Sequence, residues 1–260
     1  MTISILATVA TSTAVQVVLF LIIVRVHGVS PYFTRLFFTV TGGSHLALVG
    51  FLLVRRSDFY IIPDGLPLRR INLANVLSVS RVSSTPTILF LLVLSRDHDL
   101  AVFTIVFTSI VFFTDLLDGW ISRRGNQVTR IGAYLDSISD YAILVAVSIA
   151  FDYYGLISRW FFVLIMFRLL LQFAGMAALL LYHGRADARA TLWGKLLVSA
   201  TMVLYAGSLL ELFESTRNAA EHVTWLLEYA VAVVVIISTV EKAVLLVRAF
   251  HPAREDQDSA

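Results

Sequence analysis

Long apolar runs, separated by short polar stretches, make up most of the chain. Eight of these runs approach the roughly 20 residues that an α-helix needs to cross a bilayer. The polar stretches between them carry most of the charged residues, as loops between membrane helices do. We therefore predict an all-α polytopic membrane protein with about eight transmembrane helices, at residues 3–24, 36–54, 76–95, 100–121, 131–151, 160–182, 193–213 and 223–247.

Composition supports this class and removes several others. Of the 260 residues, 58% are hydrophobic and 15% are charged, a balance typical of membrane proteins. The absence of cysteine excludes disulfides, thiolate catalysis and cysteine-ligated metals. Residues 1–20 contain no Lys or Arg and their apolar run continues to Val24, so we expect a retained first helix and not a cleaved signal peptide.

Basic residues crowd into alternate loops. By the positive-inside rule these loops face the cytoplasm, together with both termini and the loop that follows residue 121. We therefore expect an integral protein of the cell inner membrane with a cytoplasmic site. The crowded loops contain Arg55, Arg56, Arg69, Arg70, Arg123, Arg124, Arg130, Arg185, Arg189, Lys195, Lys242, Arg248 and Arg254, against Arg25, Arg35, Arg96, Arg159 and Arg217 in the opposite loops.

Four aspartates lie inside or beside the two apolar runs that flank this loop. Asp115 and Asp118 are three residues apart, and Asp136 and Asp140 are four apart, so each pair shares one face of a helix. Ionised carboxylates at such positions are costly unless a counter-ion compensates them. An all-oxygen cluster suits hard cations better than zinc, so we predict a site for Mg²⁺ or Mn²⁺, with two ions.

Small residues and an arginine follow the first aspartate pair. Gly119 and Ser122 present no bulky side chain, so a flat ligand could approach the helix backbone closely. Arg123 carries a planar, permanently charged guanidinium that fits two phosphate oxygens at once. Together they predict a phosphate-containing ligand beside the carboxylates.

The spacing Asp-x2-Asp-Gly-x2-Ser-Arg-x8-Gly-x3-Asp-x3-Asp resembles the signature of the CDP-alcohol phosphatidyltransferase family. The family pattern has alanine where this chain has Ser122. The resemblance implies that the first three aspartates bind metal, and that Asp140 is the general base and a further metal contact. It also implies contacts with the CDP part of a donor from Gly119, Arg123 and Thr129, and we add the neighbouring Ser122.

A polar face on the run at 71–90 extends the resemblance. Asn75, Ser78 and Arg81 recur at three-residue spacing, as in the family's first core helix. Here Ala74 replaces the family's proline, and Ser78 replaces its threonine. The resemblance implies that Asn75 and Ser78 lie near the nucleotide, while a helix-packing face of small polar residues is the alternative.

Two arginines lie within apolar runs, where a charged side chain is a functional candidate by default. They are Arg81 and Arg168. Phosphatidylglycerophosphate synthases are similar in having an arginine and a Gly-Lys pair at places like those of Arg168 and Lys195. The resemblance implies acceptor contacts from Arg81, Arg168 and Lys195, although Lys195 could equally be an interfacial anchor beside Trp193.

The predicted organisation has four parts. Residues 1–56 form two extra N-terminal transmembrane helices, in which Gly42 and Gly43 predict close helix packing. Residues 57–74 form an interfacial elbow or amphipathic helix. Residues 75–250 form the six-helix core that the family resemblance implies, and residues 251–260 form a disordered tail.

The family resemblance implies transfer of a substituted phosphate from a CDP-alcohol to an acceptor alcohol with release of CMP. We favour CDP-diacylglycerol as donor and glycerol 3-phosphate as acceptor, with membrane lipids and a homodimer as partners and no nucleic acid. Tyr141 occupies the position at which phosphatidylglycerophosphate synthases commonly have lysine. Inositol phosphate, serine, or diacylglycerol with CDP-choline or CDP-ethanolamine therefore stay open. A cation or proton transporter is the alternative from another class.

Overall fold

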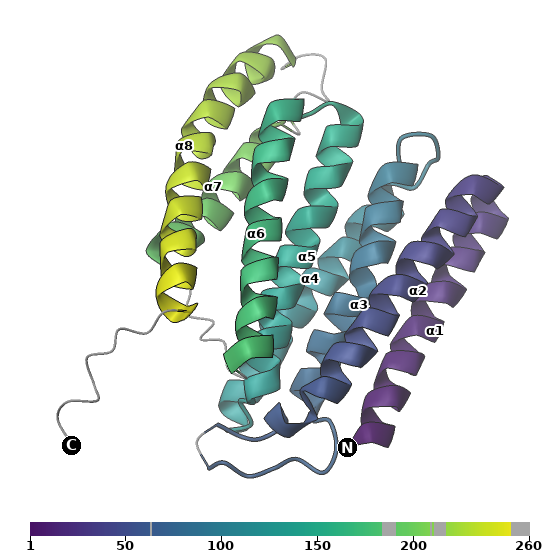
Figure 1. The fold of residues 1–260 in the computed structure, drawn as a ribbon. Helices are drawn as coiled ribbons and strands as arrows, with labels where there is room; N and C mark the ends of the chain where they lie inside the picture. Colours follow the sequence, from purple (N-terminus) through teal and green to yellow (C-terminus); the bar gives the residue numbers. More distant parts are fainter. Residues whose placement is uncertain (63, 184–190, 209, 211–216, 251–260) are drawn as a thin grey trace. The chain divides into compact units, whose positions relative to one another are not determined.

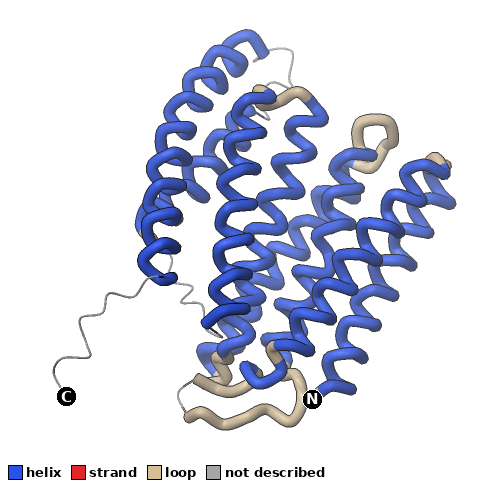
Figure 2. The backbone as a smooth tube through the Cα atoms, viewed as in Figure 1, coloured by secondary structure: helices blue, strands red, loops and turns tan. Residues whose placement is uncertain are grey.

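The computed structural model describes residues 1–62, 64–183, 191–208, 210 and 217–250, and every regular element within this part is a helix (Figures 1 and 2). For a few helical residues, among them Asp115 and Lys195, the structure describes the backbone and not the side chain. The predicted all-α class is confirmed. The helices are α1 (Thr2–His27), α2 (Pro31–Val54), the short 3-10 helix η1 (Arg56–Asp58), α3 (Leu73–Leu94), α4 (Ala101–Arg124), α5 (Arg130–Tyr154), α6 (Arg159–His183), α7 (Leu192–Ser208) and α8 (Arg217–Phe250).

Six of these helices are long and apolar enough to cross a membrane, judged by length and composition within the described residues. They are α1, α2, α3, α5, α6 and α8. Helices α4 and α7 are not among the six. The apolar part of α4 covered by the described side chains is Ala101–Val111, and α7 has 17 described residues. The end of the predicted seventh span and the predicted tail at 251–260 lie outside the described residues.

The chain divides into two compact units, residues 1–150 and 151–260. In the first unit α3 contacts α1, α2 and α4. Within its membrane-spanning window 61% of the residues are buried, against 28% for α1 and for α2. Helix α3 is therefore the centre of this unit, and Figure 1 shows it beside α2.

Serines lie on several sides of α3, and they explain why α1, α2 and α4 all pack against this helix. In an apolar medium each hydroxyl needs a hydrogen-bond partner from the protein. Gln16 of α1 donates from Nε2 to Ser84 Oγ at 3.0 Å, and His45 Nε2 of α2 lies 2.6 Å from Ser83 Oγ. The same helix directs Ser78 towards α4. A helix that is polar on several faces is stable here only when neighbours satisfy each face.

The segment between α2 and α3 is η1 followed by an extended loop (Figure 2). Isolated β-bridges join Tyr60 to Pro67 and Ile61 to Thr129, and Ile62 N donates to Val128 O at 2.9 Å. The predicted elbow at 57–74 thus contains no α-helix before Leu73 among its described residues. Backbone hydrogen bonds fasten it to the loop between α4 and α5.

In the second unit α8 contacts both α6 and α7. Glu228 of α8 is buried and accepts hydrogen bonds from Ser158 N, at 2.6 Å, and from Ser158 Oγ. Ser158 immediately precedes α6, so the carboxylate lies at the positive end of that helix. This buried contact joins the start of α6 to α8.

Glycine permits a close approach at one helix crossing of this unit. A Cβ at Gly175 would overlap Leu246 Cδ1 and lie 2.7 Å from Leu246 Cδ2. In α2, by contrast, a Cβ at Gly42 or Gly43 would meet nothing within 4 Å. Close packing at Gly42 and Gly43 is therefore not seen within the described part of the chain, because neither glycine faces another described element.

Replacement of a glycine by alanine should have opposite effects on stability at Gly43, which faces open space, and at Gly175, which faces Leu246. Gly43→Ala should raise stability by about 0.5–1 kcal/mol, because alanine favours the helix and meets no obstacle. Gly175→Ala should be less stable than Gly43→Ala by about 1–3 kcal/mol, because Leu246 must move. Thermal unfolding of both variants in one detergent measures the difference. Equal melting temperatures would show that Gly175 is not a tight crossing.

Candidate active site

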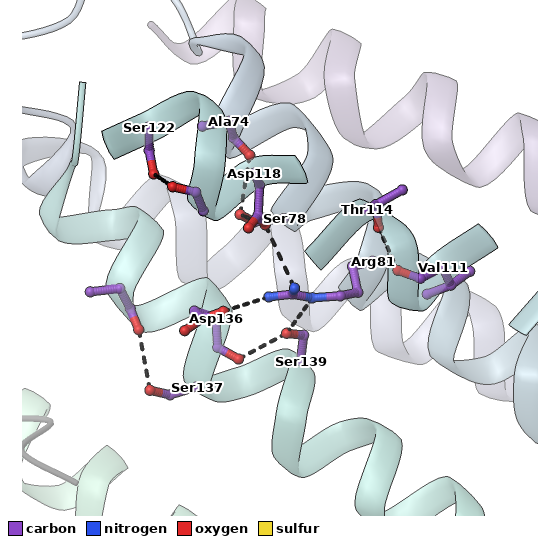
Figure 3. A network of polar contacts seen from close by, with 12 residues as sticks. Ala74, Ser78, Arg81, Val111, Thr114, Asp118, Ser122, Asp136, Ser137 and Ser139 are labelled. Atoms are coloured by element: carbon purple, nitrogen blue, oxygen red, sulfur yellow. Dashed lines mark hydrogen bonds and ion pairs between the residues drawn. The ribbon is translucent and has the colours of Figure 1, made fainter. Parts of the chain in front are cut away.

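A buried arginine on α3 connects two aspartates from different helices (Figure 3). Arg81 Nη2 donates to Asp136 Oδ1 at 2.7 Å, and Arg81 Nη1 lies 3.7 Å from Asp118 Oδ2. Arg81 Nε donates to Ser139 Oγ at 2.7 Å. Asp118 lies on α4, while Asp136 and Ser139 lie on α5. One guanidinium therefore holds α3, α4 and α5 together at this level.

The aspartates differ in their access to solvent. Asp118 is buried and accepts a further hydrogen bond from Ser78 Oγ at 2.8 Å. The Asp136 side chain is 56% exposed although it is paired with Arg81, and Asp140 is exposed as well. The cluster thus has a closed side at Asp118 and an open side at Asp136 and Asp140, where a ligand could enter.

The charges at this site do not cancel. Asp140 interacts electrostatically with Asp118, Asp136 and Arg81, so all four charges belong to one cluster. Among the described side chains of this cluster, three carboxyl groups share one guanidinium, so acidic groups outnumber basic ones. Arg81 contacts one oxygen of each partner, Oδ2 of Asp118 and Oδ1 of Asp136.

This donor set fits a divalent cation in its chemistry, because carboxylate oxygens and excess negative charge are what Mg²⁺ and Mn²⁺ require. No three described acidic or histidine side chains form a ready metal-binding group. The Asp115 side chain lies outside the described part. The metal prediction for Asp115, Asp118, Asp136 and Asp140 therefore stays a prediction.

A second, uncharged cluster lies at the start of α3. Thr129 Oγ1 donates to Asn75 Oδ1 at 2.8 Å and accepts from Gly132 N at 3.0 Å. Asn72 accepts from Asn75 N through its side chain and so caps α3. The Asn75 Nδ2 donor is buried and has no partner within the described part of the chain. An orphaned buried donor favours a ligand that brings an acceptor.

Gly132, which the motif contains, is explained by this cluster. A Cβ at Gly132 would lie 2.9 Å from both Asn75 Oδ1 and Thr129 Oγ1. Those distances are too short for carbon against oxygen, and the two oxygens are held by their own hydrogen bond. Only glycine allows the start of α5 to approach Asn75 this closely.

The first motif glycine faces Arg123. A Cβ at Gly119 would lie 3.0 Å from Arg123 Nη1, so the exposed guanidinium lies over the backbone of α4. Ser122 Oγ donates to Gly119 O at 3.2 Å, within the same helix. The structure thus places the Arg123 guanidinium over Gly119 and leaves Ser122 bonded to its own helix.

The other predicted acceptor residues belong to the second unit. Arg168 is buried in α6 and donates from Nη2 to Ser238 Oγ at 3.1 Å. The Lys195 side chain lies outside the described residues. The acceptor contacts predicted for Arg168 and Lys195 stay predictions, and Arg81 contacts the aspartates.

Sequence reasoning missed two contributors to the site. Ser139 accepts from Arg81, and its position three residues after Asp136 on one helix face was the available signal. Arg130 donates to the hydroxyls of Tyr60 and Tyr134, both at 3.1 Å. That contact joins the elbow to α5, and nothing in the local sequence pattern indicates a pairing over 70 residues.

Comparison with known proteins shows which family this chain resembles. Residues 71–250 match the family model described as CDP-alcohol phosphatidyltransferase. A putative cardiolipin synthase of Mycobacterium tuberculosis is 31% identical over 135 residues, which are 52% of this chain and 63% of the relative. A CDP-diacylglycerol--glycerol-3-phosphate 3-phosphatidyltransferase of Aquifex aeolicus is 33% identical over 91 residues, or 35% of this chain and 44% of the relative. The chain thus spans less than two thirds of the length of either relative.

Gly132→Ala tests the uncharged cluster. The new methyl group should separate Asn75 from Thr129 and weaken binding of a CDP-linked ligand about tenfold, as loss of one well-placed hydrogen bond does. Binding to the purified protein can be followed by isothermal titration. Ala133→Ser, at the next and exposed position of α5, is the matched control and should bind normally. Normal binding by Gly132→Ala would separate this cluster from the ligand site.

Proposed function

Because the chain belongs to the CDP-alcohol phosphatidyltransferase family, we propose that it transfers a substituted phosphate from a CDP-alcohol to an acceptor alcohol and releases CMP. The observation that carries this proposal is the cluster of Asp118, Asp136 and Asp140 around Arg81, inside the part of the chain that matches the family. Asp136 and Asp140 are exposed, so a water-soluble part of a substrate could reach them from the membrane surface.

The donor would bind across the two clusters. Asn75 Nδ2 supplies a buried, unused donor for an acceptor atom of the nucleotide. Arg123, held over Gly119, can pair with a pyrophosphate oxygen. Thr129 keeps Asn75 in place by donating to its Oδ1. Ser122 and Ser78 are predicted nucleotide contacts too, and the bond from Ser78 to Asp118 supports a role in orienting that carboxylate.

The metal that the family generally needs would be held by the aspartates. Asp115, Asp118, Asp136 and Asp140 are the proposed ligands of Mg²⁺ or Mn²⁺. When bound, the ion would offset the negative charge of the pyrophosphate and of the departing CMP. We assign Arg81 to holding Asp118 and Asp136, because its contacts are with those side chains and Ser139.

Asp140 is the proposed general base. It is exposed at the open side of the cluster, where an acceptor hydroxyl can reach it. The hydroxyl oxygen forms a new bond to the phosphorus that carries the donor's alcohol, and the bond from that phosphorus to CMP breaks. The hydroxyl proton passes to the Asp140 carboxylate, and CMP departs with the electron pair. Binding both substrates side by side supplies much of the rate increase.

The proposed donor is CDP-diacylglycerol, and the favoured acceptor is glycerol 3-phosphate. The Aquifex relative, named for those two substrates, supports this choice. A cardiolipin-forming reaction is the second candidate, supported by the mycobacterial relative and by Tyr141, where the lysine of glycerol-phosphate enzymes is missing. In that reaction the acceptor would be phosphatidylglycerol, because cardiolipin carries two phosphatidyl groups on one glycerol. We also propose an inner-membrane location, a cytoplasmic site and a homodimer.

Two substitutions separate binding from chemistry. Asp140→Asn should lower the rate of CMP release by about 10²–10⁴-fold, because no base accepts the hydroxyl proton, while donor binding is largely kept. Asp118→Asn should lose both donor binding and transfer. Asp99→Asn, an exposed carboxylate outside the motif, is the control and should behave as the wild type. Wild-type activity of Asp140→Asn in purified micelles would refute the assignment.

A panel of acceptors identifies the reaction. Purified protein with radiolabelled CDP-diacylglycerol and Mg²⁺ should release CMP when glycerol 3-phosphate is added. Release with phosphatidylglycerol alone would favour the cardiolipin-forming candidate, and release with inositol phosphate or serine would name another acceptor. Absence of CMP release with every acceptor, including diacylglycerol tested with CDP-choline and CDP-ethanolamine, would favour a transporter.

A further inference from the structure

A groove follows α1, which precedes the region that matches the family, and its far wall belongs to that region. Its first part, a cavity of about 410 Å³, lies between α1 and α3 and is lined by Thr8, Thr11, Ser12, Val15, Gln16 and Ser80 among others. Its second part, of about 760 Å³, is lined mainly by apolar side chains such as Val18, Ile22, Leu100 and Phe103. Thr11 and Val15 line both parts, so the two parts adjoin, one at a polar end and one at an apolar end.

Gln16, which lines the polar end, has a buried acceptor without a donor. Gln16 is 4% exposed, and its Oε1 has no hydrogen-bond partner within the described part of the chain. The neighbouring bonds fix the amide orientation. Ser84 Oγ donates to Ser80 O at 2.8 Å, so its proton is used and Gln16 must turn its NH2 group towards Ser84. Oε1 is thus left as the acceptor on the other side of the amide.

The position of Gln16 limits where a donor can come from. At about 1.5 Å per residue, Gln16 lies roughly 21 Å along α1 from Thr2, near the middle of a helix about 39 Å long. Bulk water does not reach this depth of a bilayer. The residues lining the polar end carry no charge, so a phosphate or ammonium group there would be unpaired and costly. The ligand must therefore be uncharged, apolar over most of its length, and supplied with a hydroxyl.

From these properties we propose that the α1 groove binds one neutral lipid with a free hydroxyl on its glycerol, of the diacylglycerol type. The hydroxyl donates to Gln16 Oε1 beside Ser12 and Ser80, and an acyl chain lies along the apolar part past Val18. A phospholipid fits less well, because its charged head group stays at the membrane surface. Site and ligand are separate from the carboxylate cluster, which faces the other side of α3.

Photo-crosslinking tests the proposal with the full chain in nanodiscs. Three probes carry the same diazirine acyl chain: diacylglycerol, its acetate ester without the hydroxyl, and phosphatidylcholine. Diacylglycerol should label α1 at least fivefold more than either of the others, since only it supplies a hydroxyl donor. Equal labelling by all three probes would mean that bulk lipid fills the groove, and would overturn the proposal.

Two variants examine the two ends separately. Gln16→Met keeps the length of the side chain and removes the acceptor, so it should abolish the preference for diacylglycerol over its acetate. Val18→Trp fills the apolar part and should reduce labelling by diacylglycerol several-fold, with Gln16 intact. Ile3→Trp, an exposed position on α1 outside both cavities, should label as the wild type. Full preference for diacylglycerol in both groove variants would refute the site, whatever the CMP-release assay shows.

Discussion

The pairing of Arg81 with Asp118 and Asp136 is the constraint on which the first unit depends. A guanidinium that is 1% exposed inside an apolar bundle is stable only where carboxylates compensate its charge. Those carboxylates come from α4 and α5, so their pairing with Arg81 fixes the relation of three helices. Removing one partner of such a buried pair costs about 3–5 kcal/mol, because the remaining charge stays buried and unpaired. The carboxylates of the proposed active site are therefore also structural.

This constraint explains the composition of α3. The helix turns Ser78 and Arg81 towards the carboxylates and Ser83 and Ser84 towards α2 and α1. A membrane helix with polar groups on so many sides cannot face lipid directly. The family match begins at residue 71, so α1 and α2 lie outside it. Their contacts with the serines of α3 make them a cover for the helix that carries Arg81.

Much of this arrangement could be predicted from sequence, because it follows from local patterns. Apolar runs of membrane length predicted the helices, and three-residue spacing correctly placed Ser78 and Arg81 on one face of α3. The partners of Arg81 could not be predicted, since Asp136 is 55 residues away and an acceptor phosphate would suit an arginine equally well. Close packing was expected at Gly43 and found at Gly175, because glycine alone does not say which face of a helix meets a neighbour.

The two halves of the site are held together by different interactions: one by hydrogen bonds between uncharged groups, the other by contacts between charged groups. The half formed by Asn75, Thr129 and Gly132 is uncharged and held by hydrogen bonds, and the elbow fastens its loop through backbone bonds. Such a half can keep its shape with no ligand bound. In the half around Arg81, acidic side chains outnumber basic ones among the described residues, which favours completion by a cation or by a substrate. The nucleotide of the proposed reaction would therefore meet a preformed surface at Asn75, while the carboxylates would respond to the charge of the ligand.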